Sequence, residues 1–407
     1  MKLPKSYRIA LLFNANKNFD RDVIAGVAAY MSSRRVSWDL FLEEDFRTRL
    51  AGMSHWRGDG MIANFDDPAV AGALADCRVP VVAAGSSYQN AAAYPAGVPY
   101  VASDSFKLVK LAYEHLIDVG LRNFAMYSLP VAEDNGWARE REHAFCTLLQ
   151  RDQIEVDIFR GQSTSAPAWA ESVEQQVNWL RSLPKPVGIV AVSDARARHL
   201  LQACQIAGIS VPEEVALIGI DNDPLASMLA RIPLSSVTQG AHEIGRTAAH
   251  LLHQMLGGVP LDPRNSRILV PPAGIAVRAS SGHAPTDDPR IMRARHFIRQ
   301  YGCRNIKSFQ VADFVGISRT SLEALFRREF DCSVHDEILR FRLEAATGML
   351  ALGKHSIADV ALRCGFTTSQ YMHAVFKREF GCTPKAYQER LRAGCREEDG
   401  EAALAQA

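Results

Sequence analysis

Carboxylate and amide side chains follow several short apolar runs in the first two thirds of the chain. They stand in "NANKNFDR" at 14–21, "NFDD" at 64–67, "ASD" at 102–104, "SD" at 193–194 and "DND" at 221–223. Asp, Asn and Arg side chains can each engage two neighbouring hydroxyl groups, and an aromatic ring such as that of Phe19 or Trp137 can cover an apolar C–H face. These residues therefore favour a ligand with an array of hydroxyl groups, such as a sugar.

For any single aspartate in this set the alternative is a structural role, because an Asp directly after a strand commonly caps a helix or forms a turn. Phosphate chemistry, and with it a dinucleotide-dependent enzyme, is disfavoured because the chain has neither G-x-G-x-x-G after the first apolar run nor G-x-x-x-x-G-K-[ST] anywhere. The eight cysteines lack C-x-x-C spacing and the 12 histidines lack ligand spacing. We therefore expect reduced thiols, no metal site and no cofactor.

The residues around these polar positions predict alternating strands and helices. Strand-like runs include "YRIALLF", "GMIANF", "PVVAAG" and "VALIGI", and helix-like stretches such as "RDVIAGVAAYMSS" separate them. This alternation predicts parallel sheets built from strand–helix–strand units, so the predicted fold class of this part is α/β. Ligands of such sheets bind beyond the carboxyl ends of the strands, which is where the polar residues stand.

Several longer motifs resemble the effector-binding core of the lactose repressor (LacI) family, which is similar to periplasmic sugar-binding proteins. They are "YVASDSFKLVKLAYEHLIDVG", "WARERE", "AVSDARA", "GISVPEEVALIGIDND" and "LSSVTQGAHEIGRTAAHLL", within a resemblance that covers residues 7–278. The resemblance implies two lobes joined by three crossovers, with the ligand between the lobes. The sugar contacts that it implies are Phe19, Asp104, Arg139, Ser193, Asp221 and Gln239, with Ser193 where the family has Asn. Because the chain begins directly at the first predicted strand, without that family's DNA-binding headpiece, we expect any DNA-binding part to lie elsewhere.

The last third of the chain repeats itself with an offset of fifty residues. "LFRREFDC" at 325–332 and "VFKREFGC" at 375–382 are nearly identical, and the apolar positions Leu322, Leu325, Phe326 and Phe330 recur as Met372, Val375, Phe376 and Phe380. Each copy follows a short apolar stretch, a glycine and a hydroxyl residue able to cap a helix, in "VADFVGIS" and "VALRCGFTT". Two helix-turn-helix motifs are therefore predicted, joined by a long helix over "VHDEILRFRLEAATGMLALG". The alternative, a helical hairpin that only packs, is disfavoured by the second copy.

Charge separates the same two parts of the chain. Residues 290–396 contain 19 lysines and arginines against 10 acidic residues, whereas residues 1–289 contain 27 basic and 31 acidic residues. This asymmetry predicts a polyanionic partner for the C-terminal part alone. A DNA-repair enzyme with a reactive thiol is disfavoured, because neither Cys303 nor Cys332 has a Cys or His cluster around it.

Residues 288–392 resemble the arabinose regulator (AraC) family of transcription activators. "IADVALRCGFTTSQYMHAVFKREFGCTPKAYQERLR" matches the signature of that family, whereas the first copy departs from it with Asp331 in place of Gly381. The base-facing positions that the resemblance implies are Thr320, Glu323, Ser369, Gln370 and His373, and their side chains can hydrogen-bond to base edges. The basic side chains suited to phosphate contacts, which position a protein without reading sequence, are Arg319, Arg327, Arg328, Lys377 and Arg378.

The predicted domains are an effector and dimerisation domain at 1–278, a linker at 279–289, a double helix-turn-helix domain at 290–394 and a disordered acidic tail at 395–407. The combination, with "LLFNANKNFDR", "EEDFR" and "VSDARARH", resembles the regulators of D-xylose uptake and catabolism genes. It implies a homodimeric transcription activator with D-xylose or a related sugar as effector and with promoter DNA and RNA polymerase as partners. The residues themselves support only a sugar-like ligand and duplex DNA, so a regulator that responds to another sugar or to a purine stays open.

A secreted solute-binding protein would share the first domain but would need a signal peptide. The apolar run near the N-terminus, Ile9 to Phe13, is too short for one, and no stretch approaches the roughly 20 apolar residues of a membrane span. We therefore expect a cytoplasmic protein without a membrane partner.

Overall fold

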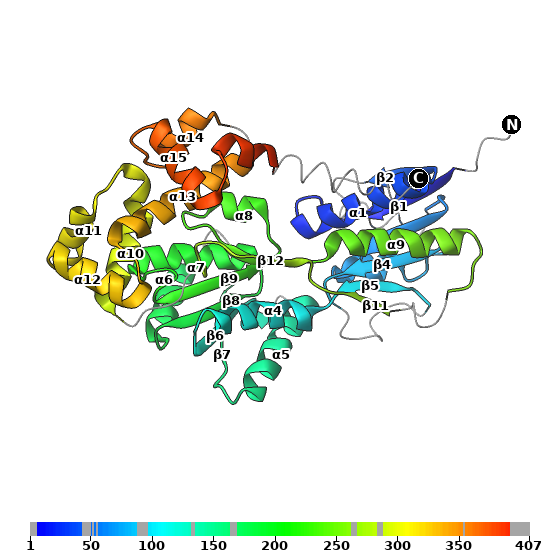
Figure 1. Cartoon of the computed structure of the whole chain (residues 1–407). Coiled ribbons are helices and arrows are strands. Elements are labelled where there is room, and N and C mark those ends of the chain that lie inside the picture. Colours follow the sequence, from blue (N-terminus) through cyan, green and yellow to red (C-terminus); the bar gives the residue numbers. More distant parts are fainter. Residues whose placement is uncertain are drawn as a thin grey trace. The chain divides into compact units, whose positions relative to one another are not determined.

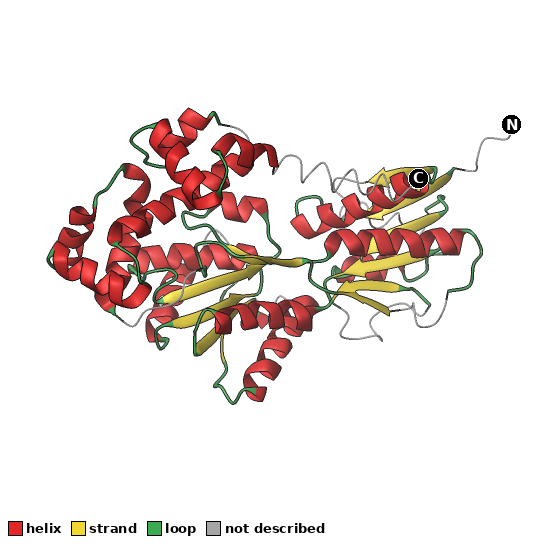
Figure 2. Ribbon diagram, in the orientation of Figure 1, coloured by secondary structure: helices red, strands yellow, loops and turns green. Residues whose placement is uncertain are grey.

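The computed structural model describes residues 6–42, 50, 53, 56–87, 97–131, 135–162, 169–261, 267–282, 288–352 and 355–390. The chain divides into two compact units, 1–285 and 286–407, and the division falls inside the segment predicted as the linker. The first unit contains both strands and helices, whereas the second is helical in its described part (Figure 2). None of the described helices is long and apolar enough to span a membrane.

The first unit consists of two lobes, and many of their elements are labelled in Figure 1. The first lobe contains strands β1 (Tyr7–Leu12), β2 (Trp38–Leu42), β3 (Gly60–Asn64), β4 (Val81–Gly85), β5 (Tyr100–Ser103) and β11 (Arg267–Val270), and helices α1 (Asn18–Arg34), α3 (Pro68–Leu74) and α9 (Ala241–Leu256). The second lobe contains strands β6 (Asn123–Ser128), β7 (Asp157–Arg160), β8 (Val187–Ala191), β9 (Val215–Ile220), β10 (Ser235–Thr238) and β12 (Gly274–Ala276), and helices α4 (Ser105–Asp118), α5 (Gly136–Arg151), α6 (Trp169–Ser182), α7 (Asp194–Ala207) and α8 (Pro224–Leu229).

Each lobe is built on a six-stranded sheet. The strand order of the first sheet is β11-β5-β4-β3-β1-β2, with parallel neighbours throughout. The order of the second is β12-β10-β9-β8-β6-β7, and β12 pairs antiparallel with β10 at its edge. Central strands such as β3, β4 and β8 are buried along their whole length, because side chains on both faces of the sheet are covered. The predicted α/β fold class is confirmed.

The chain passes between the lobes three times, as the resemblance implies. It leaves the first lobe between β5 and α4, returns between β10 and α9, and leaves again between β11 and β12. Backbone hydrogen bonds join the crossovers: Asp104 N donates to Val270 O at 2.8 Å, and Ala273 N donates to Thr238 O at 2.9 Å. The three connections therefore lie beside one another.

Helices α1 and α9 cross closely through two glycines in the first lobe. A Cβ atom at Gly26 would lie 1.9 Å from the carbonyl oxygen of His242, and one at Gly245 would lie 2.0 Å from that of Val23. Backbone atoms of a packed helix cannot move aside as the end of a flexible side chain can. The crossing therefore requires glycine on both helices, and it fixes α1 against the rest of the lobe.

We expect Gly245→Ala to destabilise the first unit by about 3 kcal/mol, because the added methyl group must push two helices apart. A matched control is Gly72→Ala in α3, where an added Cβ meets nothing within 4 Å. That change should stabilise the protein by about 0.5–1 kcal/mol, because Ala favours helix over Gly. Urea unfolding of the full chain measures both effects. Equal stabilities of the two variants would mean that the crossing tolerates a side chain.

The second unit is made of α10 (Pro289–Tyr301), η6 (Gly302–Arg304), α11 (Ser308–Val315), α12 (Arg319–Phe330), α13 (Val334–Leu352), α14 (Ile357–Arg363) and α15 (Ser369–Phe380). Both predicted helix-turn-helix motifs are present, as α11–α12 and α14–α15. Ser318 caps α12 by accepting from Ser321 N at 3.1 Å, and Thr368 caps α15 by accepting from Tyr371 N at 3.1 Å. The predicted caps and the predicted long helix, now α13, are therefore confirmed.

Helix α13 joins the two motifs. Its Ile338 belongs to the core of the first motif, with Leu322 and Phe326, whereas its Leu343 belongs to the core of the second. The buried Arg342 of α13 also donates to two carbonyl oxygens that follow α10, those of Gly302 at 2.9 Å and Ile306 at 3.0 Å. The two motifs are therefore held at a fixed separation.

The described part of the predicted linker differs from the expectation. Residues 279–281 are buried in the second lobe, where Ser280 Oγ donates to Leu217 O at 2.6 Å and accepts from Ser235 N at 2.8 Å. At the other end, Asp288 caps α10 by accepting from Arg290 N at 2.9 Å. Small polar residues can bond to buried backbone as readily as they fill a linker, so composition alone did not separate the two. The predicted acidic tail lies outside the described residues.

Candidate functional site

A buried arginine lies in the first unit near a group of polar side chains, which we call the polar cluster. Its members are Asp66, Asp194, Asp221 and Gln239. Arg141 of α5 is 1% exposed, its Nη1 donates to Val192 O at 2.6 Å, and its guanidinium carbon lies 4.9 Å from the ring centre of Trp137. Among the residues that the structure describes, no group accepts a hydrogen bond from the Nε atom of Arg141. An unsatisfied donor on a buried cation costs free energy, so this atom is suited to receive an acceptor from a ligand.

Carboxylates of both lobes lie near enough to Arg141 for their charges to affect its pKa. Burial lowers the pKa of its guanidinium, and nearby negative charges, those of Asp221 and Asp66 first among them, oppose that shift. Asp66 follows β3 in the first lobe and Asp221 follows β9 in the second. Negative charges of both lobes thus act on one buried cation.

A chain of hydrogen bonds connects Asp221 to the crossovers. Gln239 Nε2 donates to Asp221 Oδ1 at 2.6 Å, and Ser103 Oγ donates to Gln239 Oε1 at 2.6 Å. Ser103 ends β5 at the first crossover, and Gln239 lies at the second. A ligand that bonds to Asp221 would therefore contact groups connected to the segments about which the lobes can move.

Two residues of the first lobe organise the segment between β1 and α1. The buried carboxylate of Asp20 accepts from Asn14 N at 2.6 Å and from Asn64 Nδ2 at 2.7 Å, and burial raises its pKa to about 6. Asn18, the first residue of α1, donates from Nδ2 to Asp221 O in the second lobe at 3.4 Å. This segment therefore reaches from one lobe to the other beside the cluster.

Asp194 is a buried carboxylate of the second lobe. It accepts from Ser236 Oγ at 2.6 Å and from Asp223 N at 2.7 Å. Burial first, and then the charge of Asp221, raise the pKa of Asp194 to about 7 from the ordinary value of 3.8. An acid with a higher pKa in the folded than in the unfolded chain binds its proton more tightly when folded, so its contribution to stability is present at low pH and is lost as the pH rises from about 4 to 7.

We expect Asp194→Asn to remove this loss, because an amide can accept from Asp223 N and donate to Ser236 Oγ without carrying charge. The melting temperature of the variant should exceed that of the wild type at about pH 7.5 and approach it at about pH 5. Asp67→Asn is the control, because the Asp67 side chain caps α3 by accepting from Ala69 N at 3.0 Å and Asn can do the same. A constant difference between wild type and Asp194→Asn at every pH would contradict the assignment.

The six predicted sugar contacts lie in different environments. Asp221 and Gln239 belong to the cluster around Arg141. Phe19 is buried in the hydrophobic core of the first lobe. Asp104 caps α4 by accepting from Lys107 N at 3.1 Å, and Ser193 caps α7 by accepting from Arg196 N at 3.4 Å. Asp104 and Ser193 thus have the helix-capping role that is the alternative to ligand binding for residues directly after a strand. Their contact with a sugar stays a prediction.

The sixth predicted contact, Arg139, is exposed on α5, whereas Arg141 is buried. Residues two apart on a helix point in nearly opposite directions, so only one arginine of "WARERE" can face the cluster. The sequence analysis selected Arg139 and not Arg141, and contact of Arg139 with a sugar stays a prediction. Asp66 and Asp194 lie in the stretches "NFDD" and "SD", but neither was selected as a candidate site residue. Their positions just after β3 and β8 could have indicated them.

In the second unit, the predicted DNA contacts lie on the outer faces of α12 and α15. The exposed ones are Arg319, Thr320, Arg327, Arg328, Gln370, Lys377 and Arg378, and Ser369 and His373 are half-buried. The inner faces of the same helices carry the buried Leu322 and Met372. Both helices thus present polar and basic side chains opposite their cores.

Glu323 is held differently from the other predicted base contacts. Its Oε2 accepts from the backbone N of Val334, the first residue of α13, at 3.1 Å. In the second motif the position equivalent to Val334 is Pro384, which has no backbone N–H, so the residue equivalent to Glu323, His373, cannot make the same bond. Glu323 therefore ties α12 to α13, and hydrogen bonding to a base would compete with that contact.

Among the residues that the structure describes, no group of three or more His, Cys, Asp and Glu side chains is placed to hold a metal ion. The described cysteines form no disulfide with one another. In the part of the chain that the structure describes, the candidate ligand site contains hydrogen-bonding side chains, the Arg141 cation and the Trp137 ring.

Comparison with known proteins matches three segments of the chain to family models. Residues 8–106 match the XylR N-terminal domain, residues 113–281 a periplasmic binding protein-like domain, and residues 311–390 a helix-turn-helix domain. The three segments follow one another in the order that the fold shows.

Whole-length relatives are also found. The xylose operon regulatory protein of Escherichia coli K12 is 43% identical over 387 residues, which is 95% of this chain and 97% of that protein. The protein of the same name from Haemophilus influenzae is 40% identical over 94% of this chain and 98% of its own length. A solved structure of a xylose-binding transcription activator aligns with a TM-score of 0.85 and 42% identity, over 95% of this chain and 98% of that one. The chain belongs to the family of xylose operon regulatory proteins.

Proposed function

We propose that this protein is a transcription activator that binds D-xylose in its first unit and promoter DNA in its second. The observation that carries the sugar half is the buried Arg141, whose Nε has no acceptor among the described residues and whose cation interacts with negative charges of both lobes. A neutral sugar matches this set, because each hydroxyl can donate to a carboxylate while it accepts from a guanidinium. A sugar phosphate or a sugar acid would instead face carboxylates of like charge.

Sugar binding is coupled to DNA binding in this proposal through closure of the lobes. A ligand that bonds to groups of both lobes stabilises the closed arrangement of the lobes. Closure reorients a dimer surface on the first unit, and the two helix-turn-helix domains of the homodimer then fit their DNA half-sites. To shift such an equilibrium from 1:99 to 99:1, the sugar must bind the DNA-competent state about 5.5 kcal/mol more tightly than the other. The DNA-bound dimer then recruits RNA polymerase.

The DNA half of the proposal rests on the repeated motif. Helix α13 has 19 residues, which at 1.5 Å per residue gives a spacer of about 28 Å. Successive major-groove faces on one side of a duplex recur at about 34 Å. Two helix-turn-helix motifs joined by such a spacer can therefore enter neighbouring major grooves.

Calorimetry on the full chain tests the sugar half. The panel comprises D-xylose, L-arabinose, D-ribose, D-glucose, D-xylose 5-phosphate, adenine and guanine. We expect D-xylose to bind most tightly and the sugar phosphate to give no heat. Tightest binding of another neutral sugar would leave the site in place and change the effector, whereas binding of a purine alone would replace the sugar hypothesis with the second candidate.

A duplex selected from a random pool by the full-length protein with D-xylose tests the DNA half. Gln370→Ala should lower affinity for that duplex and relax discrimination at one base pair by about 1–3 kcal/mol. Lys377→Ala should instead weaken binding to selected and scrambled duplexes alike, and reduce the dependence of log K on log salt by about 0.9. Loss of discrimination in Lys377→Ala, with none in Gln370→Ala, would contradict these roles.

A further inference from the structure

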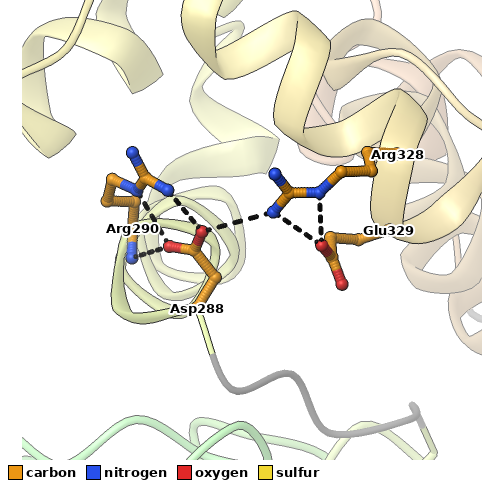
Figure 3. A network of polar contacts seen from close by, with 4 residues as sticks. All are labelled: Asp288, Arg290, Arg328 and Glu329. Carbon is orange, nitrogen blue, oxygen red and sulfur yellow. Dashed lines mark hydrogen bonds and ion pairs between the residues drawn. The ribbon is translucent and has the colours of Figure 1, made fainter.

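An acidic residue at the start of the second unit contacts α12, the second helix of the first helix-turn-helix motif. Asp288 caps α10, and its carboxylate also accepts from Arg290 Nε at 3.0 Å and from Arg290 Nη2 at 2.7 Å. Its Oδ2 lies 3.8 Å from Arg328 Nη2 of α12. Figure 3 shows the carboxylate between the two guanidinium groups, with Glu329 beside Arg328. The hydrogen bonds from Arg290 hold the pKa of Asp288 at about 2, so this carboxylate is charged under ordinary conditions.

The repeat within the unit supplies an internal comparison. Arg328 and Arg378 stand fifty residues apart at the same place on α12 and α15, and each donates from Nε to the glutamate that follows it at 2.8 Å. Both side chains are 63% exposed. Arg328 has the second ion pair, with Asp288, whereas the described residues give Arg378 only the ion pair with Glu379 and a longer-range effect on Asp336. The contact with Asp288 therefore belongs to the first helix-turn-helix motif and has no counterpart in the described part of the second.

A phosphate group that binds Arg328 must compete with two carboxylates, whereas one that binds Arg378 competes with a single one. Asp288 also has a well-defined position, because it is 13% exposed and its oxygens are bonded to the backbone and side chain of Arg290. A carboxylate held in this way keeps an arginine near it without having to become ordered first.

We propose that Asp288 restrains the first helix-turn-helix motif by competing with DNA phosphate for Arg328, and that the sugar effector relieves this restraint. The inference rests on the proposed function, because it requires α12 to bind DNA. Asp288 lies three residues beyond residue 285, the last residue of the first unit, at the start of the second unit. Because the covalent connection from the first unit enters the second unit at this point, we take the effector to act on Asp288 through it, and displacement of the Asp288 carboxylate leaves Arg328 available to phosphate.

A double-mutant cycle on the full chain tests the competition. Asp288→Asn retains the helix cap, because Asn caps helices as well as Asp, but removes the negative charge. Without sugar, it should raise affinity for the selected duplex about two- to fivefold, the range of an exposed ion pair, and should steepen the salt dependence by up to about 0.9. The gain should disappear in an Arg328→Ala background and persist in an Arg378→Ala background. Equal gains in both backgrounds would reduce the effect to the loss of one negative charge near DNA and would overturn the proposal.

The response to sugar is the second readout. Asp288→Asn should lower the ratio of duplex affinities with and without saturating D-xylose by the same factor by which it raises affinity without sugar. An unchanged ratio would show that the effector does not act through this contact. Failure of the proposed function is distinguishable, because the wild type itself would then not bind the duplex or not respond to D-xylose, whereas failure of this inference leaves the wild type responsive and the cycle uncoupled.

Discussion

Arg141→Met should bind D-xylose at least about 100-fold more weakly than the wild type, which corresponds to about 2.7 kcal/mol. The substitution keeps an unbranched side chain of moderate length but removes the charge and every donor. It leaves Asp221 without the cation that stabilises its ionised form. Calorimetry with D-xylose measures the loss, and circular dichroism of the same sample establishes that the variant is folded.

The matched control lies two residues earlier on the same helix. Arg139→Met makes the same chemical change on the exposed side of α5 and should leave D-xylose affinity within about twofold, as surface substitutions usually do. Arg141→Lys retains the charge but not the planar fork, so it should fold if Arg141→Met does not and should still lose most of the affinity. Loss of binding in Arg139→Met with normal binding in Arg141→Met would refute the assignment from geometry and restore the one from family resemblance.

Gly365→Ala should destabilise the second unit by about 3 kcal/mol or more, because two costs act at one position. The residue has a φ of +78°, and a Cβ atom there would lie 2.7 Å from the carbonyl carbon of Cys303 and 2.9 Å from its Cα. Cys303 lies in η6, so the added atom would press the turn of the second motif against the segment that follows α10. We expect the variant to lose binding of the selected duplex at 37 °C while its D-xylose affinity is unchanged, because the first unit is not altered.

Gly316→Ala separates the two costs. Gly316 occupies the corresponding turn of the first motif with a φ of +83°, but nothing lies within 4 Å of an added Cβ. Backbone strain alone should then destabilise the unit by about 1–2 kcal/mol. Urea unfolding of both variants measures the difference. Equal losses would mean that the contact with Cys303 adds nothing, and that the two turns differ only in sequence.

Local patterns determined most of the architecture. Apolar strands separated by amphipathic helices predicted the α/β class of the first unit, because period and composition depend only on which faces of an element are buried. The repeat predicted two reader motifs, and the hydroxyl residues before α12 and α15 predicted their caps, because a cap bonds within three residues of itself. The connecting helix α13 followed from the length of its helical pattern.

The site residues depended on contacts between distant segments. Sequence placed two arginines on α5, but which of them enters the polar cluster depends on how that helix packs, and this selected Arg141. The same holds for Glu323, which bonds to a residue 11 positions away, and for Asp288, whose partner Arg328 lies on another helix.

Sequence by itself therefore determined the fold class, the two readers and the family resemblance, because these follow from short-range periodicity and motif order. The tertiary structure alone decided which polar side chains meet, because burial and long-range packing give each charge its partners.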